Sequence, residues 1–593
     1  MVRDAKLFSR VCVNSTVILY ASDVSNTEFT RYIQHYSVSD VFAAKLIFGE
    51  KMKKNIFVSI LTIALLLPSL VIGQTVKISS KERKMAEAIT AAQISNYLYF
   101  VASDAMGGRD TPSQGLDITA EFLKMNLDRW GFKPAGDKGT FFQKIALMRE
   151  SINADKMKLE IGGTQYKFGD DYFRLSGSGT ATGQLVFGVD GWMVKSKGVD
   201  SFAGVDVKGK IVVISSSGFS QGTLTPRPAN VSADDLKGEK GVDWADAITH
   251  ATKEGAVGVI LVAPPQLQNN WAQVRNFLSR GSLFPEKLRE NAGTAPTIPT
   301  LLVSQSLGEA IFAGEAANKT STSAFALNKS ASFAAEGKKD TVWTQNVVAV
   351  WEGSDPTLKD EMVAIGAHYD HVGTNQNAPG EDKIWNGADD DGSGTVAVLS
   401  IAEALAKAKT RPKRSILFVW HAGEEKGLWG ADYFNRFPTI DIKKVIAQLN
   451  IDMIGRSKKA GDTNPKNKDL SGENTIYVIG ADMMSSTLGA ITKGTNDAYL
   501  KMTYDYRYDD PKDTNQFFFR SDHFHYAVNG IPIAFWFDGV HEDYHQPGDS
   551  PDKIDYAKME KVTRTIFLTM LELADLKARP SVDKKLPPEL TQR

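Results

Sequence analysis

Residues 415–425 of the chain read Ser-Ile-Leu-Phe-Val-Trp-His-Ala-Gly-Glu-Glu, an apolar run that ends in two adjacent acids. A short continuous apolar run predicts a strand that is buried on both faces of a sheet. Packing gives no reason for two carboxylates at the end of such a strand, because charged side chains are seldom buried without a partner. Glu424 and Glu425 therefore indicate a polar site where the sheet ends.

The sequence around this run alternates between strand and helix patterns. We expect strands over residues 346–351, 362–367, 415–420, 445–451, 475–480 and 531–537, and helices over residues 394–408, 428–437 and 558–576. Such alternation predicts an α/β fold with a mixed, mostly parallel sheet flanked by helices. In such a sheet the carboxyl ends of the strands converge on one crevice.

Other polar segments follow the expected strands. Seven of the nine histidines lie between His368 and His545. Taken singly, a histidine at a strand end is more often a hydrogen-bonded core residue, and an aspartate-rich loop is more often a helix cap. Their succession at strand ends favours one shared site. The segments are Ala-His-Tyr-Asp-His (367–371), Gly-Ala-Asp-Asp-Asp-Gly-Ser-Gly (387–394), Asn-Ile-Asp-Met (450–453) and Tyr-His-Gln-Pro-Gly-Asp (544–549).

Length and composition narrow the possible functions. A chain of 593 residues is too long for one hydrophobic core, so we expect two or more domains. With 69 basic and 70 acidic residues, the net charge of -1 provides no excess that would attract nucleic acid or an anionic membrane surface. Cys12 is the only cysteine, which excludes an internal disulfide and a thiolate metal site. Any metal must be held by histidine and carboxylate.

The amino-terminal region carries a targeting pattern. The apolar run Ile56–Ile72 follows Met52-Lys-Lys and ends at Gly73, which is typical of a secretory signal peptide over residues 52–73. The alternative is a transmembrane anchor, for which the run is near the lower length limit. Because a signal belongs at the start of a chain, we interpret residues 1–51 as a gene-model extension. We expect a secreted or periplasmic protein without a stable membrane anchor after cleavage.

These ordered segments resemble a known group, the zinc-dependent exopeptidase family that contains secreted di-zinc aminopeptidases, glutamate carboxypeptidases and glutaminyl cyclases. The resemblance covers residues 93–134 and 346–576, and the β-rich stretch between them resembles the protease-associated domain that is commonly inserted there. It implies the zinc exopeptidase fold. The implied organisation is an N-terminal part of the peptidase domain at residues 74–150, an inserted domain at 151–338, the catalytic domain at 339–578 and a tail at 579–593.

The resemblance also implies a metal centre with two Zn²⁺ ions. Asp390 would bridge them, with His368 and Asp452 completing one shell and Glu425 and His545 the other. Five further histidines fall outside the matching positions and receive no metal role: His371, His421, His523, His525 and His541.

The catalytic roles that the resemblance implies belong to four residues. Glu424 would be the general base, and Asp370 would orient the imidazole of His368. Tyr544 would donate to the developing oxyanion, or else serve only in packing. Arg520 would contact substrate, or else form a structural ion pair.

Our hypothesis is an exported di-zinc metallo-aminopeptidase that removes N-terminal residues, especially apolar ones, from peptides. Three alternatives remain open. A carboxypeptidase of the same family would need a basic cluster, and only Arg456, Arg507 and Arg520 lie near the motifs. A glutaminyl cyclase would hold a single zinc, and a non-catalytic receptor domain would lack ligands. Counting the metal ions separates the cyclase from the peptidases.

Overall fold

The computed structural model describes residues 10–13, 16–19, 76–215, 225–279, 281–289, 298–408 and 410–591. The chain divides into two compact units, residues 1–74 and 75–593. In the first unit, β1 (Arg10–Val13) and β2 (Thr16–Leu19) pair in antiparallel fashion. The expected signal peptide lies outside the described residues. No helix in the described ranges is long and apolar enough to cross a membrane.

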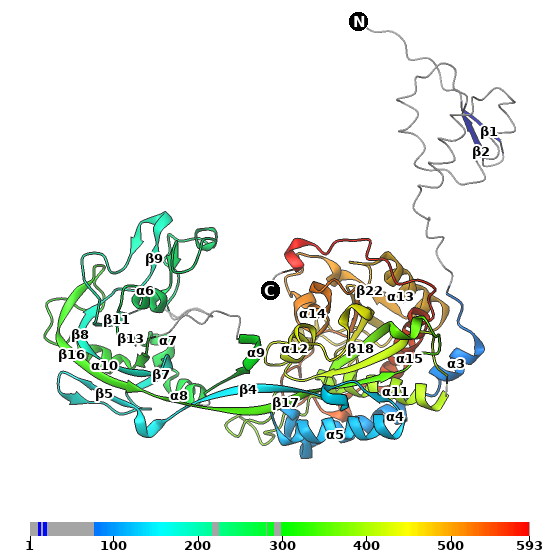
Figure 1. The fold of residues 1–593 in the computed structure, drawn as a ribbon, viewed down its shortest axis with the longest axis horizontal. Helices are drawn as coiled ribbons and strands as arrows, with labels where there is room; N and C mark the ends of the chain where they lie inside the picture. The colour runs from blue at the N-terminus through cyan, green and yellow to red at the C-terminus, as the bar shows by residue number, and fades with distance from the viewer. Residues whose placement is uncertain are drawn as a thin grey trace, which may run out of the picture. The chain divides into compact units, whose positions relative to one another are not determined.

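The largest sheet of the second unit has ten strands, and several of them are labelled in Figure 1. Its centre consists of four mutually parallel strands in the order β19 (Ser415–His421), β18 (Met362–His368), β20 (Val445–Ile451) and β23 (Ile533–Phe537). Antiparallel strands extend it at both sides. Beyond β19 lie β17 (Gly337–Trp351), β4 (Phe142–Ile152) and β14 (Ser282–Pro285), and β3 (Lys133–Pro134) also pairs with β17. Beyond β23 lies β21 (Thr475–Ile479), which pairs in parallel with β22 (Thr503–Asp505).

Both faces of the central sheet are covered, which explains why its strands read as apolar runs. In β18, Val363, Ile365 and Ala367 contribute to one core, whereas Met362 and Ala364 contribute to the other. The first core packs under α3 (Ser80–Ala86), α4 (Ala91–Val101), α5 (Gln114–Arg129), α11 (Gly394–Ala408), α13 (Ser486–Ala498) and α15 (Tyr556–Ala574). The second packs under α12 (Trp429–Arg436) and α14 (His523–Val528).

The stretch that interrupts this fold builds a sheet of its own. Eight strands lie in the order β6 (Thr164–Gln165), β5 (Lys158–Ile161), β16 (Phe325–Ala335), β8 (Gly179–Phe187), β11 (Ile211–Ser215), β13 (Gly258–Val262), β15 (Thr300–Val303) and β7 (Tyr172–Ser176). Strands β8, β11, β13 and β15 are parallel. The helices α6 (Ala247–Lys253) and α10 (Gln305–Phe312) pack on this sheet.

The parallel strands fix where polar residues meet. Strands β18, β19 and β20 run in the same direction and end at His368, His421 and Ile451. The segments that follow them therefore emerge at one edge of the sheet. The α/β architecture predicted from the strand and helix patterns is confirmed.

Candidate metal centre

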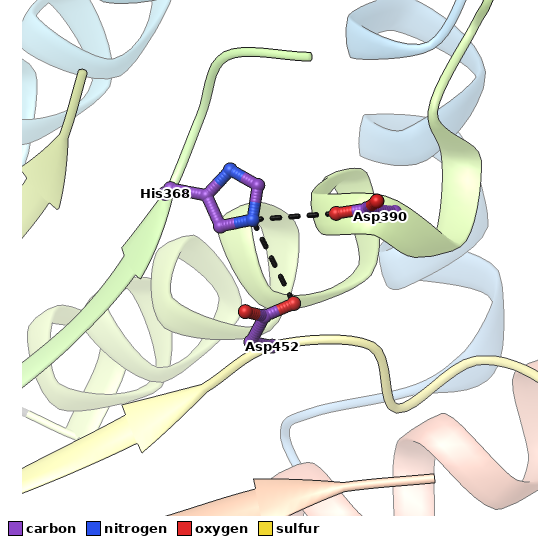
Figure 2. Close-up of side chains that lie close together, drawn as sticks. All are labelled: His368, Asp390 and Asp452. Carbon is purple, nitrogen blue, oxygen red and sulfur yellow. Dashed lines mark ion pairs between the residues drawn. The ribbon is translucent and has the colours of Figure 1, made fainter. Parts of the chain in front are cut away.

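Three ligand-type side chains meet at the ends of β18 and β20. The Nε2 atom of His368 lies 3.3 Å from Asp390 Oδ1 and 3.6 Å from Asp452 Oδ1. Figure 2 shows both carboxylates pointing at this nitrogen, Asp390 from the turn before α11 and Asp452 from the end of β20. All three residues are buried.

A second group shares Asp390. The Nε2 atom of His545 lies 3.1 Å from Asp390 Oδ2 and 3.0 Å from Glu425 Oε2. The two oxygens of Asp390 thus face different neighbours, Oδ1 towards His368 and Oδ2 towards His545. This arrangement lets one carboxylate bridge two ions, and the structure brings together all five residues named as ligands by resemblance.

Main-chain contacts hold the turn that carries Asp390. Gly387 adopts a φ of 57°, a conformation that glycine reaches without strain. The amides of Asp389 and Asp390 each donate to the carboxylate of Asp549, at 3.1 Å. Asp391 accepts from the amides of Gly394 and Met453, which ties the start of α11 to the segment after β20. These bonds hold the main chain of the turn in place, while the carboxylate of Asp390 faces the histidines.

Four polar atoms of the cluster have no hydrogen-bond partners. This holds for the Nε2 atoms of His368 and His545, for Asp390 Oδ2 and for Glu425 Oε1. Buried polar atoms are nearly always paired, so a group of orphaned atoms that face one another needs an explanation. Nitrogen and oxygen ligands without thiolate suit Zn²⁺, and the cluster fits ions of this kind.

The charges around the two histidines also favour binding of cations by the cluster. Burial alone would lower the pKa of His368, but the negative charges of Glu424 and Asp452 outweigh it and hold the pKa well above its ordinary value. Burial also lowers the pKa of His545, but Asp390 and Glu425 outweigh this effect and raise the pKa from 6.5 to about 10. The excess of buried negative charge thus attracts cations, and divalent ions would replace the imidazole protons.

Glu424 stands beside this cluster and is largely buried. Its Oε2 atom lies 3.8 Å from His368 Nε2. Burial raises the pKa of Glu424 well above its ordinary value, and repulsion by Glu425 and Asp452 adds to the rise against the attraction of His368. A carboxylate in such a place accepts a proton readily.

Asp370 supports both His368 and Glu424. The main-chain carbonyl of Asp370 lies 3.2 Å from Nδ1 of His368, whereas its carboxylate oxygen is 3.6 Å away. The Asp370 carboxylate accepts hydrogen bonds from the amide of Glu424 at 3.2 Å and from the hydroxyl of Thr111 at 3.1 Å. Asp370 therefore touches the imidazole through its main chain and the expected base segment through its side chain.

A pocket opens next to the cluster, with Tyr544 and Arg520 on its wall. The Arg520 guanidinium donates to the Tyr544 hydroxyl at 3.1 Å, and the Tyr544 ring stacks on His545 with centroids 4.0 Å apart. Burial and the nearby Asp390 raise the pKa of Tyr544, so the phenol stays protonated. The rest of the lining consists of three acidic and five apolar residues: Asp390, Glu424 and Asp452, and Met453, Phe517, Phe535, Phe537 and Val540.

Sequence reasoning did not identify every residue of this site. Of the apolar lining residues, only Met453 lies in a polar segment quoted above, and Asp549 was quoted only as the end of a loop. The described structure also places the buried His371 against Glu425, at 2.8 Å. The four other unassigned histidines contact different partners: His421 with Asp522, His525 with Asp432, His541 with Asp389, and His523 with the ring of Phe535.

Comparison with known proteins agrees with this description. Residues 346–570 match the profile of peptidase family M28, and residues 181–311 match that of the PA domain. A probable leucine aminopeptidase of Arthroderma benhamiae is 31% identical over 228 residues, which are 37% of this chain and 56% of that protein. Aminopeptidase Y of Saccharomyces cerevisiae is 33% identical over 141 residues, which are 24% of this chain and 22% of that protein.

The solved structures to which the chain is similar include an aminopeptidase from Aneurinibacillus sp. strain AM-1. It is 18% identical, with a TM-score of 0.46, over 84% of this chain and 97% of that one. The chain spans 56% of the length of the Arthroderma relative and less of the yeast protein.

Proposed function

Since residues 346–570 belong to peptidase family M28 and a PA domain precedes them, we propose that the chain is an exported di-zinc aminopeptidase. It would remove N-terminal residues from peptides. The observation that carries the proposal is the gathering of two imidazoles and three carboxylates, with orphaned ligand atoms, beside a further buried glutamate.

The ligand roles follow from which oxygen faces which histidine. Asp390 would bridge the ions, because its two oxygens face His368 and His545 separately. Asp452 would complete the shell on the side of His368, and Glu425 the shell on the side of His545. When bound, two zinc ions supply Lewis-acid polarisation of the scissile carbonyl and lower the pKa of the attacking water.

The remaining steps are assigned to residues of the chain. Glu424 would take the proton from the attacking water and deliver it to the leaving amine. Asp370 would hold the main chain of Glu424 in place. Tyr544 would donate its hydroxyl proton to the oxygen of the reacting carbonyl, since Arg520 leaves that proton unused.

The pocket supports an aminopeptidase over a carboxypeptidase. Arg520 is its only basic lining residue in the described part of the chain. A carboxypeptidase pocket would need more positive charge for the terminal carboxylate. The apolar lining residues favour peptides that begin with an apolar residue.

The expected processing and domain boundaries belong to this proposal. Residues 52–73 would be removed during export, which leaves a chain that starts near Gln74, is secreted or periplasmic and has no membrane anchor. The peptidase domain would comprise residues 74–150 and 339–578, with the inserted domain at 151–338 restricting access of substrates. N-terminal sequencing of the exported protein tests the processing.

The activity is tested with a panel of aminoacyl p-nitroanilides, with and without a chelator, alongside zinc counting by mass spectrometry. We expect two zinc ions per chain and faster hydrolysis of leucyl and phenylalanyl than of aspartyl substrates. The matched variant Glu424→Gln keeps the shape of the side chain and should retain zinc while losing at least about a hundredfold in turnover. A single zinc ion with conversion of N-terminal glutamine to pyroglutamate would favour the cyclase instead.

A further inference from the structure

The side chain of Arg109 is fully buried. Arg109 ends a short helical turn, Asp104–Arg109, and its main chain has a left-handed φ of 49°. A residue other than glycine is uncommon in this conformation and persists there only where the surrounding structure holds it. A buried charge is likewise costly unless nearby groups compensate for it. Both features of Arg109 therefore need an explanation from its contacts.

The guanidinium of Arg109 donates to main-chain carbonyls. Its Nε atom donates to Tyr369 at 2.9 Å, and its terminal nitrogens donate to Val101 at 2.8 Å, Asn386 at 2.7 Å and Gly387 at 2.8 Å. Four of the five N–H groups are thus used, in directions that the planar group fixes. A lysine carries one nitrogen on a flexible stem and cannot bind the carbonyls of three separate segments in this way.

Two of these segments carry expected metal ligands. Tyr369 directly follows His368, the last residue of β18, and Gly387 directly precedes the turn that carries Asp390. The same guanidinium therefore joins the two segments, and through Val101 it also joins them to the end of α4. The distance of 3.3 Å between His368 Nε2 and Asp390 Oδ1 depends on how these segments lie against each other.

The main chain at Arg109 also binds the segment after β18. The carbonyl of Arg109 accepts from the amide of His371 at 3.2 Å, and the carbonyl of Gly108 accepts from the amide of Gly373 at 3.0 Å. Main chain and side chain of Arg109 thus hold the same segment. This double attachment explains why its left-handed conformation persists.

A tryptophan next to these carbonyls extends the contacts to a third expected ligand. The indole N–H of Trp385 donates to the main-chain carbonyl of His545 at 2.9 Å. Trp385 immediately precedes Asn386, whose carbonyl accepts from Arg109. Three of the five expected ligands thus lie in segments that the guanidinium holds directly or through one neighbouring residue.

Charge alone does not select an arginine at this place. Burial lowers the pKa of the Arg109 guanidinium, while the negative charges of Asp370, Asp549, Asp391 and Asp390 act against burial. These carboxylates would compensate for any buried cation, lysine included. What a lysine would lack is the set of four directed hydrogen bonds. Replacement by lysine therefore separates the bonds from the charge.

We propose that Arg109 is a positioning residue of the metal centre, whose four hydrogen bonds hold the segment after β18 against the turn that carries Asp390 before any ion binds. The inference rests on the proposed function insofar as it requires zinc in the site. Because the ligands are placed in advance, zinc binds without reorganisation of the main chain. Loss of the bonds should weaken zinc binding by about 10–100-fold, as for other residues that orient ligands.

Zinc titration by calorimetry on Arg109→Lys tests the proposal. We expect at least one binding event to be weaker than in the wild type by about tenfold or more. Arg414→Lys is the matched control. Arg414 is also buried and pairs with Glu361 at 2.7 Å, but it precedes β19, at the opposite end of that strand from the cluster. It should lose stability and bind zinc as the wild type does. A folded Arg109→Lys protein with wild-type affinity for both ions would refute the proposal.

Cobalt in place of zinc gives a spectroscopic measure of the ligand geometry, since the visible absorption of Co²⁺ depends on its coordination. At saturating cobalt, Arg109→Lys should show an altered visible band, whereas Arg414→Lys should show that of the wild type. If Arg109 served only the stability of the fold, both variants would unfold more easily and both would keep the wild-type spectrum. That result would overturn the inference.

Crystal structures of the wild-type protein with and without zinc test the proposal even if the variants do not fold. We expect the four bonds of Arg109, and the main chain of residues 368–371 and 386–391, to be the same in both. A zinc-free structure in which the guanidinium has released Asn386 or Gly387 would overturn this inference and leave the proposed function standing. A wild-type protein that binds no zinc would overturn both.

Discussion

Removal of one hydroxyl from the pocket wall should separate catalysis from metal binding. The Tyr544→Phe substitution leaves the ring, and with it the stacking on His545 at 4.0 Å. It removes the oxygen that accepts from Arg520 at 3.1 Å. Because arginine can only donate, the hydroxyl proton of Tyr544 is left for a partner in the pocket. We expect this partner to be the carbonyl oxygen of the reacting peptide bond.

The magnitude follows from that geometry. Loss of one donor to a developing oxyanion costs about 3 kcal/mol of transition-state stabilisation. This corresponds to a decrease of about 150-fold in kcat. KM should change little, because the bond to a developing charge is stronger in the transition state than in the ground state. Since the pKa of Tyr544 is raised, the loss should be constant across the usual range of assay pH.

The assay compares kcat and KM of wild type and Tyr544→Phe on a leucyl p-nitroanilide, with the zinc content of both proteins measured in parallel. Arg520→Met serves as the companion variant, since it removes the bond to the hydroxyl but keeps the hydroxyl itself. Its loss in kcat should be smaller than that of Tyr544→Phe. The reasoning is refuted if Tyr544→Phe changes kcat by less than about threefold, or if the whole effect falls on KM.

Three other substitutions test separate parts of the description. His368→Ala should lose zinc affinity together with activity, as measured by metal analysis after dialysis, because it removes one imidazole of the cluster; retention of both ions would contradict its role. Glu424→Ala should bind zinc as the wild type does but lose at least about a hundredfold in kcat, and a fully active variant would exclude it as the base. Burial lowers the pKa of His523 from 6.5 to about 3, so the folded state stays neutral while the unfolded state binds a proton below pH 6.5, and stability is lost as the pH falls from that value. In urea unfolding with chelator present, wild type should therefore lose about 2 kcal/mol more than His523→Leu between pH 7 and pH 5; equal losses would show that His523 is not held neutral.

The strand and helix pattern of the peptidase part was readable from the sequence. The predicted helix over residues 394–408 and the predicted strand over 445–451 coincide with α11 and β20. The strand over 415–420 is one residue longer as β19. These elements are buried on both faces or along a wide stripe, so contiguous apolar residues carry most of the information about them.

The first residues of the helices were harder to predict, because a single residue can determine where a helix begins whatever the apolar pattern. The helix expected over residues 428–437 begins at Trp429, since Leu428 adopts a left-handed conformation with a φ of 61°. The helix expected over 558–576 begins earlier, at Tyr556, where Asp555 accepts from the amide of Lys558 and caps it. Neither the left-handed conformation of Leu428 nor the cap at Asp555 is visible in the spacing of apolar residues.

The sequence by itself determined the class of fold and the kinds of side chain at the strand ends, because strand and helix periodicity are properties of adjacent residues. The resemblance then singled out His368, Asp390, Glu425, Asp452 and His545, which the structure brings together.

Only the tertiary structure decided which other residues contact these five and which residues line the pocket beside them. Asp549 reaches the amide of Asp390 across 159 positions of the chain, and His371 lies 2.8 Å from Glu425. The apolar wall of the pocket joins Met453 to Phe517 and Val540. Such contacts depend on how the sheet twists and how the loops pack at its carboxyl edge, and no local pattern in the chain encodes that arrangement.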